Sequence, residues 1–390
     1  MTLLVNNGVE DADPLDAQLS SVASGRSRIR GSRRSRMRLA LGLSPTPRPG
    51  LVLLPLGMTL GPHGLGVLSV PVLTGLDPVV SVALAALGAF VGMDLELRRL
   101  REWFLLLTAS VEASVTLLVV AGGVLMVHGL SGVSEATPWL MAVLLGICAA
   151  PSSTGVSFAP AQNVSPARRI GDLDDVLPLV LGVLAFAALR EGSPLDVARL
   201  SAQATLIALT IAVAGWLLVW RTSSDTEHRV FAIGTLLLLG GAAAHLSLSA
   251  LFAGFVAGSF WNAAGSVARD RIERDLRYLH HPLIALLLLV AGARMQLSLD
   301  LVGLAAVYLI CRMAGKLAGG WLASFTSAGK VPRDLGLHLM APGVVGIAFA
   351  LNALKVRSDA EGTALLTIVI AGSLASDLVS LASSEPEQPA

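Results

Sequence analysis

The sequence predicts an all-α integral membrane protein with about twelve transmembrane helices, and its composition, apolar segments and loop charges all indicate that class. Of the 390 residues, 54% are hydrophobic and 14% are charged, with a mean hydropathy of +0.72. Soluble domains carry roughly 25% charged residues, so this chain lacks the groups that cover a surface facing water. The net charge of +1 gives no reason to expect a nucleic-acid partner.

A spanning helix needs about 20 mostly apolar residues, and the chain contains a series of such segments. No polar domain separates them, so a single membrane domain over residues 49–384 is expected. The predicted spans are 50–70, 77–96, 104–128, 138–161, 166–190, 200–220, 228–246, 248–264, 281–298, 300–324, 335–354 and 362–383.

The positive charges of the loops predict which side of the membrane each loop faces. Lys and Arg gather in the N-terminal segment and in every second loop, as at Arg98 and Arg99 and at Arg168 and Arg169. Because such loops face the cytoplasm, both termini are predicted to be cytoplasmic, in a multi-pass protein of the cell inner (plasma) membrane.

The first 48 residues are polar and rich in Ser and Arg, and they hold no apolar stretch long enough for a signal peptide. We expect a disordered, Arg-rich cytoplasmic tail there, and a second short tail over residues 385–390. The alternative for the first tail is a patch that binds anionic lipid, since each clustered Arg gains about 1 kcal/mol at such a surface.

Ionisable side chains inside the predicted spans are the candidate functional groups, because charges are costly in hydrocarbon. The fifth span, RRIGDLDDVLPLVLGVL, carries Asp174 and Asp175 side by side. Two adjacent carboxylates at that depth cannot both ionise easily, and they titrate as one coupled unit. Such a pair binds either a dehydrated monovalent cation or protons, which is the competition that exchange requires. The alternative is a capped helix N-terminus, which suits Asp172 better than the pair.

The tenth span, ICRMAGKLAGGWLAS, carries Arg312 and Lys316 four residues apart, and therefore on one side of a helix. A buried Lys needs a compensating carboxylate, and an ion pair with Asp174 or Asp175 would supply one that an incoming cation breaks. Snorkelling to the cytoplasmic interface is the alternative for Lys316. Glu112 in the third span is a candidate partner for Arg312, in a structural ion pair.

Two spans carry helix breakers near their centres, the fourth in LLGICAAPSSTGVSFAP and the eleventh in LHLMAPGVVGIAFAL. Unwound backbone at membrane depth is tolerated where it is buried in protein or lines a cavity, and paired breaks in two halves indicate a transporter's binding site. The units 104–190 and 300–383 would then be inverted repeats, whereas simple proline kinks are the alternative. The breaks contain Pro151, Gly155, Pro342, Gly343 and Gly346, and Ser152, Ser153 and Thr154 could offer oxygens to a cation.

Five stretches occur in order along the chain: LPLGMTLGPHGLGVL, GAFVGMDLELRRLR, DLDDVLPLVL, LFAGFVAGSFWNAAG and LLLLVAGARMQLSLDL. Together they resemble the cation:proton antiporter superfamily, in its bacterial-type sodium/hydrogen exchanger branch, over residues about 48 to 383. The resemblance implies an inverted-repeat sodium/proton antiporter fold with two broken crossing helices and a core domain that moves against a scaffold. It assigns the family's paired aspartates to Asp174 and Asp175 and its basic residue to Lys316. That combination is similar to the electrogenic subset, which moves two protons per cation.

The chain also departs from the family pattern at three places. The eleventh span reads PGVVG where many members carry a Pro-Arg-Gly-Glu-like stretch, and Asp172 is an additional acid. Polar, Arg-rich sequence stands where one subset has an extra N-terminal helix that helps to form the dimer, which leaves the interface of a homodimer open.

The sequence thus predicts a secondary active transporter that exchanges a monovalent cation for protons by alternating access, with Na⁺ first and Li⁺ or K⁺ as other candidates. The expected partners are these ions, the lipid bilayer and a second copy of the chain. Two rivals remain, namely a sodium-coupled symporter of the same fold and a non-transporting membrane sensor or scaffold. No enzyme activity and no cofactor are expected, because the sequence shows no nucleophile–base pair, metal cluster or phosphate loop.

Overall fold

The computed structural model describes residues 49–95, 100–131, 138–153, 166–190, 193–221, 224–265, 267–326, 331, 334–357 and 359–383. These residues form helices and connecting turns, together with one isolated β-bridge. The predicted tails over residues 1–48 and 385–390 lie outside the described residues.

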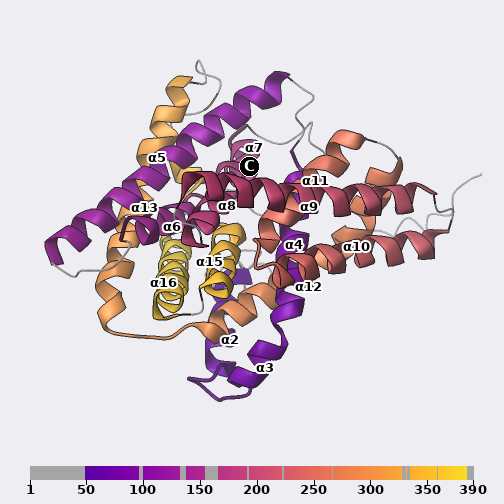
Figure 1. Ribbon diagram of the computed structural model, residues 1–390. Coiled ribbons are helices and arrows are strands. Elements are labelled where there is room, and N and C mark those ends of the chain that lie inside the picture. The colour runs from indigo at the N-terminus through magenta and orange to yellow at the C-terminus, as the bar shows by residue number, and fades with distance from the viewer. Residues whose placement is uncertain are drawn as a thin grey trace, which may run out of the picture. The chain divides into compact units, whose positions relative to one another are not determined.

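The helices follow one another as a chain of long and short segments (Figure 1). They are α2 Pro49–Leu60, α3 Val70–Gly75, α4 Asp77–Met93, α5 Leu100–Ser131, α6 Pro138–Ala149, α7 Pro166–Leu173, α8 Val176–Arg190, α9 Pro194–Arg221, α10 Asp225–His245, α11 Ala250–Ala264, α12 Val267–Arg294, α13 Asp300–Thr326, α14 Leu335–His338, α15 Val344–Val356 and α16 Ala360–Ser383.

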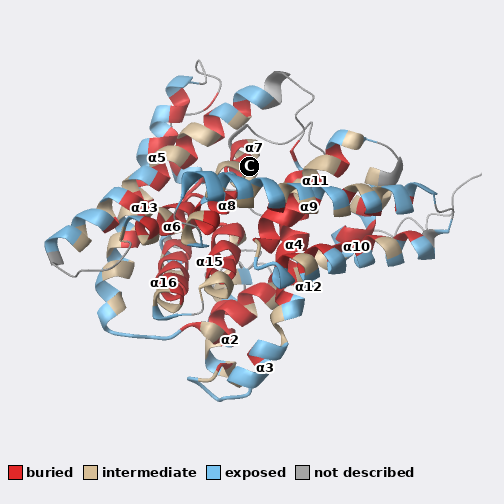
Figure 2. Cartoon of the chain, viewed as in Figure 1, coloured by how far each residue is buried: buried red, intermediate tan, exposed pale blue. Residues whose placement is uncertain are grey.

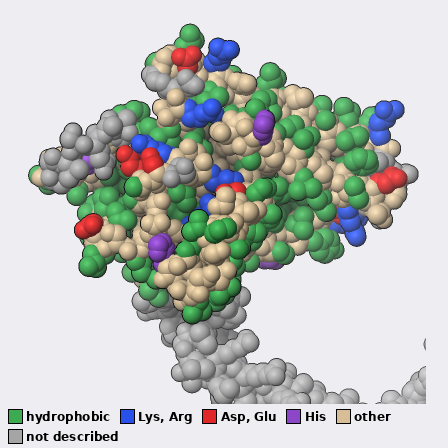
Figure 3. Space-filling model, turned by 60° about the horizontal axis from the view of Figure 1, so that its bottom comes forward, with side chains coloured by type: hydrophobic (Ala, Val, Ile, Leu, Met, Phe, Trp, Pro, Cys, Tyr) green, Lys and Arg blue, Asp and Glu red, His purple; other side chains and the backbone are tan. Residues whose placement is uncertain are grey.

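Five of the described helices are long and apolar enough to cross a membrane, namely α5, α9, α12, α13 and α16. Shorter apolar helices, among them α4, α6 and α15, accompany them. Hydrophobic side chains are spread over the face seen in Figure 3, whereas charged side chains gather in a few groups. The chain is therefore a multi-pass membrane protein whose described residues are nearly all helical, as the sequence predicts.

Helix boundaries differ from the prediction at α2 and α12. The first span was expected over 50–70, but α2 ends at Leu60, where Gly61 and Pro62 turn the chain. The ninth was expected to start at 281, but α12 already begins at Val267, within a run of charges. Glu273 forms ion pairs there with Arg269 and with Arg277, each one helical turn away, and such pairs stabilise a helix in polar surroundings.

Helices α4 and α11 pack side by side along a seam of glycines (Figure 1). A Cβ atom built on Gly88 of α4 would collide with the carbonyl oxygen of Leu251, and one on Gly254 of α11 would collide with that of Ala85. Gly92 and Gly258, four residues further along each helix, are equally crowded. Small residues at this spacing let two backbones approach closely inside a membrane. Both helices are mostly buried (Figure 2).

Two three-helix units surround the candidate site, each with a break in its middle segment. One unit contains α5, α6 and the pair α7 and α8, and the other contains α13, the pair α14 and α15, and α16. Helix α5 lies along α13, and α6 contacts both α15 and α16, so the two units form one packed body. This arrangement corresponds to the units that the sequence predicts over 104–190 and 300–383.

A charged cluster connects the start of α4 to the C-terminal ends of α12 and α15. Arg294, the last residue of α12, donates to a carboxylate oxygen of Asp77 over 2.7 Å and to the carbonyl oxygen of Leu73 over 2.8 Å. Lys355 of α15 donates to the carbonyl oxygen of Asp77 over 2.8 Å and to the hydroxyl of Ser81. These contacts join the start of α4 to the ends of two other helices.

Candidate functional site

The two broken helices meet at their breaks. Helix α6 ends at Ala149 and α15 begins at Val344, and the extended residues next to these ends form an antiparallel bridge between Ser152 and Pro342. The N–H of Ser153 donates to the carbonyl oxygen of Ala341 over 2.9 Å. Gly343 suits this approach, because a Cβ atom there would lie 3.1 Å from the carbonyl oxygen of Ser152, tighter than most Cβ contacts.

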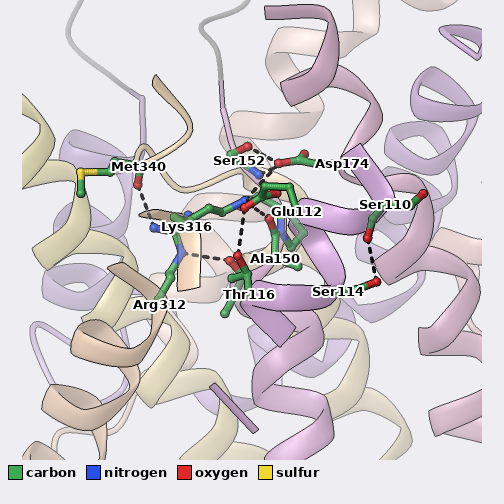
Figure 4. A network of polar contacts seen from close by, with 12 residues as sticks. Ser110, Glu112, Ser114, Thr116, Ala150, Ser152, Asp174, Arg312, Lys316 and Met340 are labelled. Carbon is green, nitrogen blue, oxygen red and sulfur yellow. Dashed lines mark hydrogen bonds and ion pairs between the residues drawn. The ribbon is translucent and has the colours of Figure 1, made fainter. Parts of the chain in front are cut away.

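Arg312 of α13 holds both breaks together with one guanidinium group (Figure 4). Its Nε donates to the carbonyl oxygen of Ala149 over 3.1 Å, and its Nη2 donates to that of Pro151 over 3.3 Å. Its Nη1 donates to the carbonyl oxygen of Met340 over 2.8 Å. A cation is favourable at the carboxyl end of a helix, where carbonyl groups lack intrahelical partners. Arg312 therefore satisfies backbone groups that the breaks would otherwise leave unpaired in a buried place.

Lys316, one turn further along α13, lies between two carboxylates and a carbonyl group (Figure 4). Its Nζ atom is 3.1 Å from Oδ2 of Asp174 and 3.2 Å from Oε2 of Glu112, and it also donates to the carbonyl oxygen of Ala150. The Lys316, Asp174 and Glu112 side chains are all 0% exposed. The other carboxylate oxygen of Glu112 accepts a 2.9 Å hydrogen bond from the Thr116 hydroxyl.

Two glycines on α13 allow this close arrangement. A Cβ atom on Gly315 would lie 2.9 Å from Cα of Thr116, and one on Gly319 would lie 2.8 Å from the carbonyl oxygen of Glu112. Both distances are shorter than real Cβ contacts, so α13 can reach α5 only where these side chains are absent. The glycines on either side of Lys316 therefore position its ammonium group against Glu112.

The acidic pair occupies a turn that interrupts the fifth predicted span. Helix α7 ends at Leu173 and α8 begins at Val176, so Asp174 and Asp175 form the junction. Asp174 accepts hydrogen bonds from the backbone N–H of Ser152 over 3.3 Å and from the Ser152 hydroxyl. Oδ1 of Asp175 is buried without a hydrogen-bond partner. The pair thus combines a fully bonded carboxylate with one that has a free oxygen.

The structure brings together most of the residues that the sequence singles out. Asp174, Lys316, Arg312 and Ser152 meet directly through side-chain contacts. Pro151, Pro342 and Gly343 form the crossing, and Gly346 packs against the carbonyl oxygen of Cys148 on α6. Ser153 takes part through its backbone N–H. Thr154 and Gly155 lie outside the described residues.

Two predictions about these side chains are wrong, and one alternative is excluded, since Lys316 forms the predicted ion pair with Asp174. Glu112 pairs with Lys316 and not with Arg312, because Arg312 is directed to the carbonyl groups of the breaks. Asp172 is not an N-terminal cap, since it lies in the last turn of α7. Lys316 does not snorkel, because its side chain is fully buried among its partners.

Sequence reasoning missed the contact between Glu112 and Lys316, although two signals were present. Thr116 lies one helical turn after Glu112, where its hydroxyl can reach the carboxylate. Gly315 and Gly319 surround Lys316 in the sequence and indicate a close helix contact there. Cys148 and Cys311 are free cysteines.

The donor set suits a monovalent cation better than a resident transition metal. Among the described residues, no three His, Cys, Asp or Glu side chains gather as a metal site would require. A cation at Asp174 and Asp175 would instead find carboxylate, hydroxyl and carbonyl oxygens, which are the ligands that hard cations prefer.

A solved structure shares this fold. The chain is similar to the sodium proton antiporter MjNhaP1 from Methanocaldococcus jannaschii, with a TM-score of 0.64 and 16% sequence identity. The match covers 94% of this chain and 99% of that chain. No known protein family matches the sequence, and no curated protein matches it either. The likeness confirms the predicted antiporter-like fold.

Proposed function

We propose that the protein is a secondary active transporter that exchanges a monovalent cation for protons. The antiporter-like fold supports cation and proton exchange in general terms. The proposal depends on one observation, the Asp174 carboxylate shared between Lys316 and Ser152 beside the free oxygen of Asp175. A cation entering this site gains the oxygens of both aspartates and displaces the ammonium group of Lys316 from Asp174.

Protons and the monovalent cation compete because the aspartate pair lies inside the protein. Two carboxylates in adjacent positions repel each other in a medium of low dielectric, so one of them takes up a proton or a cation. Because both ligands use the same oxygens, binding of one releases the other. Access to the site would alternate between the two sides of the membrane as the breaks move against the neighbouring helices. We take Na⁺ as the first candidate, with Li⁺ and K⁺ next, and a cytoplasmic location for both termini in the inner membrane.

The test uses everted membrane vesicles from cells that lack their own exchangers, with a dye that reports the internal pH. After respiration acidifies the interior, addition of Na⁺, Li⁺ or K⁺ should release protons through the wild-type protein. Asp175→Asn and Asp174→Asn should each abolish this response. Asp196→Asn is the matched control, because Asp196 is an exposed acid in the first turn of α9. Normal exchange by both site variants would show that the site is elsewhere.

A further inference from the structure

Close glycine contacts divide the helices into two sets. The first set, which we call the body, contains α5 to α8 and α13 to α16, and the second, the frame, contains α2 to α4 and α9 to α12 (Figure 1). Within the body, a Cβ atom on Gly146 of α6 would lie 2.7 Å from the carbonyl oxygen of Leu117 on α5. Within the frame, a Cβ atom on Gly57 of α2 would collide with the carbonyl oxygen of Leu289 on α12.

Contacts of this kind do not join the body to the frame. Wherever the structure describes what an added Cβ atom would meet, a collision occurs only with atoms of the same set. Gly50 of α2 approaches Asp377 of α16 across the boundary, but its added Cβ atom would lie 3.4 Å away, an ordinary van der Waals distance. Backbones thus interlock within each set, and the boundary between the sets is the surface along which the helices can shift.

Polar side chains connect the body to the frame. Arg190, at the end of α8, donates to the carbonyl oxygens of Leu246 over 3.1 Å and of Ser247 over 3.3 Å, both of which follow α10. Nδ2 of Asn352 on α15 donates to the hydroxyl of Ser249, which caps α11, over 3.0 Å. Both contacts cross the boundary.

Two more contacts of this type join α15 and α16 to the frame. Nζ of Lys355 on α15 donates to the carbonyl oxygen of Asp77, at the start of α4, over 2.8 Å. The backbone N–H of Gln296, just after α12, donates to the Thr367 hydroxyl over 3.2 Å, and that hydroxyl lies 3.2 Å from the carbonyl oxygen of Gln296. Four residues of the body therefore bind the frame.

The four contacts lie at one end of the molecule. Helix α12 ends beside the start of α4, because Arg294 binds there. Helix α11 runs parallel to α4, since Gly88 faces Leu251 and Gly92 faces Phe255. The starts of α4 and α11 and the ends of α8, α12 and α15 are therefore together.

The opposite end carries a different arrangement. At 1.5 Å per residue, α4 ends roughly 25 Å from its start, and there Arg169 of α7 donates to the carbonyl oxygen of Asp94 over 3.1 Å. Asp172, two residues before the aspartate pair, is partly exposed. By the same rule the pair lies roughly 21 Å from Arg190 along α8. The four contacts thus close the end that is farther from the aspartates.

Each contact can exchange its partner for water when the body moves. Arg190, Leu246 and Ser247 are exposed already. Asn352 is 2% exposed and Ser249 is 4% exposed, so in the present position their hydrogen bond excludes water from the boundary. A hydrogen bond of ordinary strength shifts an equilibrium between two positions by about fivefold.

We propose that these four contacts form a latch that holds the body in the position seen here and closes this end of the boundary. The inference depends on the proposed function, because an exchanger must offer the aspartate pair to both sides of the membrane. In each cycle the latch opens when the pair turns towards this end, and it closes when the pair turns back. The strength of the latch therefore sets the relative affinity for the cation at the two sides.

The first experiment measures KM for the cation from each side, in everted and in right-side-out vesicles. Apparent affinity from one side is proportional to the fraction of protein that faces it, so the ratio of the two KM values reports the equilibrium. Asn352→Leu and Lys355→Met should each shift this ratio by about fivefold, towards tighter binding at the latch end. Arg357→Gln is the control and should leave the ratio unchanged, because Arg357 binds Asp359 and Glu361 within the body.

Thiol labelling identifies which vesicles present the latch end. Leu299, between α12 and α13, is 90% exposed at that end. In a chain with Cys148→Ala and Cys311→Ala, an impermeant maleimide added outside should modify Leu299→Cys in one vesicle type only. That vesicle type supplies the KM of the latch end.

The outcomes separate the latch from the proposed function. If Asn352→Leu and Lys355→Met exchange normally with an unchanged ratio, or with a shift in the other direction, the latch is overturned while the proposed function stands. If no monovalent cation drives proton movement in the wild-type vesicles, the proposed function fails and the latch fails with it.

The second experiment closes the latch reversibly and does not require any contact to be weakened. In the cysteine-free chain, Arg190→Cys and Ser247→Cys are joined by a short, reducible bifunctional thiol reagent, which should stop exchange until it is reduced. The control pair, Arg357→Cys with Glu361→Cys, lies within the body, and cross-linking it should leave the rate unchanged. Full exchange by the linked Arg190→Cys and Ser247→Cys pair would show that the latch does not open, which contradicts the inference.

Discussion

The backbone N–H of Gly343 donates a hydrogen bond to the carbonyl oxygen of Pro151 over 3.2 Å, and this contact joins the break before α15 to the break after α6. A second hydrogen bond between the two breaks runs from the N–H of Ser153 to the carbonyl oxygen of Ala341. Each break thus satisfies backbone groups of the other. Irregular backbone at membrane depth requires such partners, because no water is available there.

Replacement of Arg312 by Gln should destabilise the protein strongly. The change leaves three buried carbonyl groups, those of Ala149, Pro151 and Met340, without their charged donor. The Pro151 carbonyl keeps the N–H of Gly343, but each buried polar group left unsatisfied costs about 1–3 kcal/mol. The midpoint of thermal unfolding in detergent should therefore fall by many degrees.

Arg190 provides the matched control for that variant. Its guanidinium group also binds carbonyl oxygens, those of Leu246 and Ser247, but it does so at an exposed position. Arg190→Gln should lower the midpoint only slightly, since water replaces the lost donor. Equal losses in the two variants would show that burial of Arg312 is not the cause.

Ser152→Ala should weaken binding of the cation while the protein remains folded. The Ser152 hydroxyl donates to Asp174 and stabilises its charged form, and hydrogen bonds to charged groups contribute about 1.5–3 kcal/mol. Protons should then compete better, and the KM for the cation in the vesicle assay should rise by roughly tenfold. Ser153→Ala should leave KM unchanged, because Ser153 contributes its backbone N–H to the crossing. An unchanged KM in Ser152→Ala would rule out this role of the hydroxyl.

Gly88→Ala should impair folding, although alanine usually favours helices. The added methyl group would collide with the carbonyl oxygen of Leu251 on α11, and overpacking of this kind costs about 1–3 kcal/mol. Yield of monodisperse protein and its unfolding midpoint should both fall. In Gly122→Ala the new Cβ meets no atom within 4 Å, so that variant should be as stable as wild type or slightly more stable. Equal yields and unfolding midpoints in the two variants would contradict the close contact between α4 and α11 at Gly88.

Lys355→Met should loosen the first turn of α4 and the last turn of α15. The variant loses the contacts from Nζ to the Asp77 carbonyl and the Ser81 hydroxyl. Hydrogen–deuterium exchange of peptides covering residues 76–84 and 350–357 should become faster. Arg357→Gln is the control at the same end, since its partners Asp359 and Glu361 are partly exposed and such pairs contribute only about 0–1 kcal/mol. Faster exchange in both variants would argue against a specific role for Lys355.

Much of this architecture could be predicted, because the membrane imposes simple requirements on a sequence. Apolar length identified the helices, and prolines with nearby glycines identified the breaks at Pro151 and Pro342. The start of α12 could not be found in this way. Its charged residues have the composition of a loop, and the helix depends there on pairs such as Glu273 with Arg277.

The site was harder to predict in detail, because contacts between helices depend on their rotation and register. The sequence indicates that Asp174, Glu112 and Lys316 are buried, but not which of the two acidic helices faces the lysine. The structure shows that both do, since Gly315 and Gly319 bring α13 against α5. Arg312 was expected to pair with a carboxylate. Its guanidinium group instead donates to carbonyl oxygens at the breaks of both helices.

The glycine seam between α4 and α11 has a practical consequence for handling the protein. Where backbone meets backbone, no space remains for a lipid or detergent tail to enter. Helices α5 and α9 instead present large apolar side chains outward, as at Leu118, Met126, Leu206 and Trp220. The choice of detergent should therefore affect these outer helices first, while α4 and α11 stay together during solubilisation.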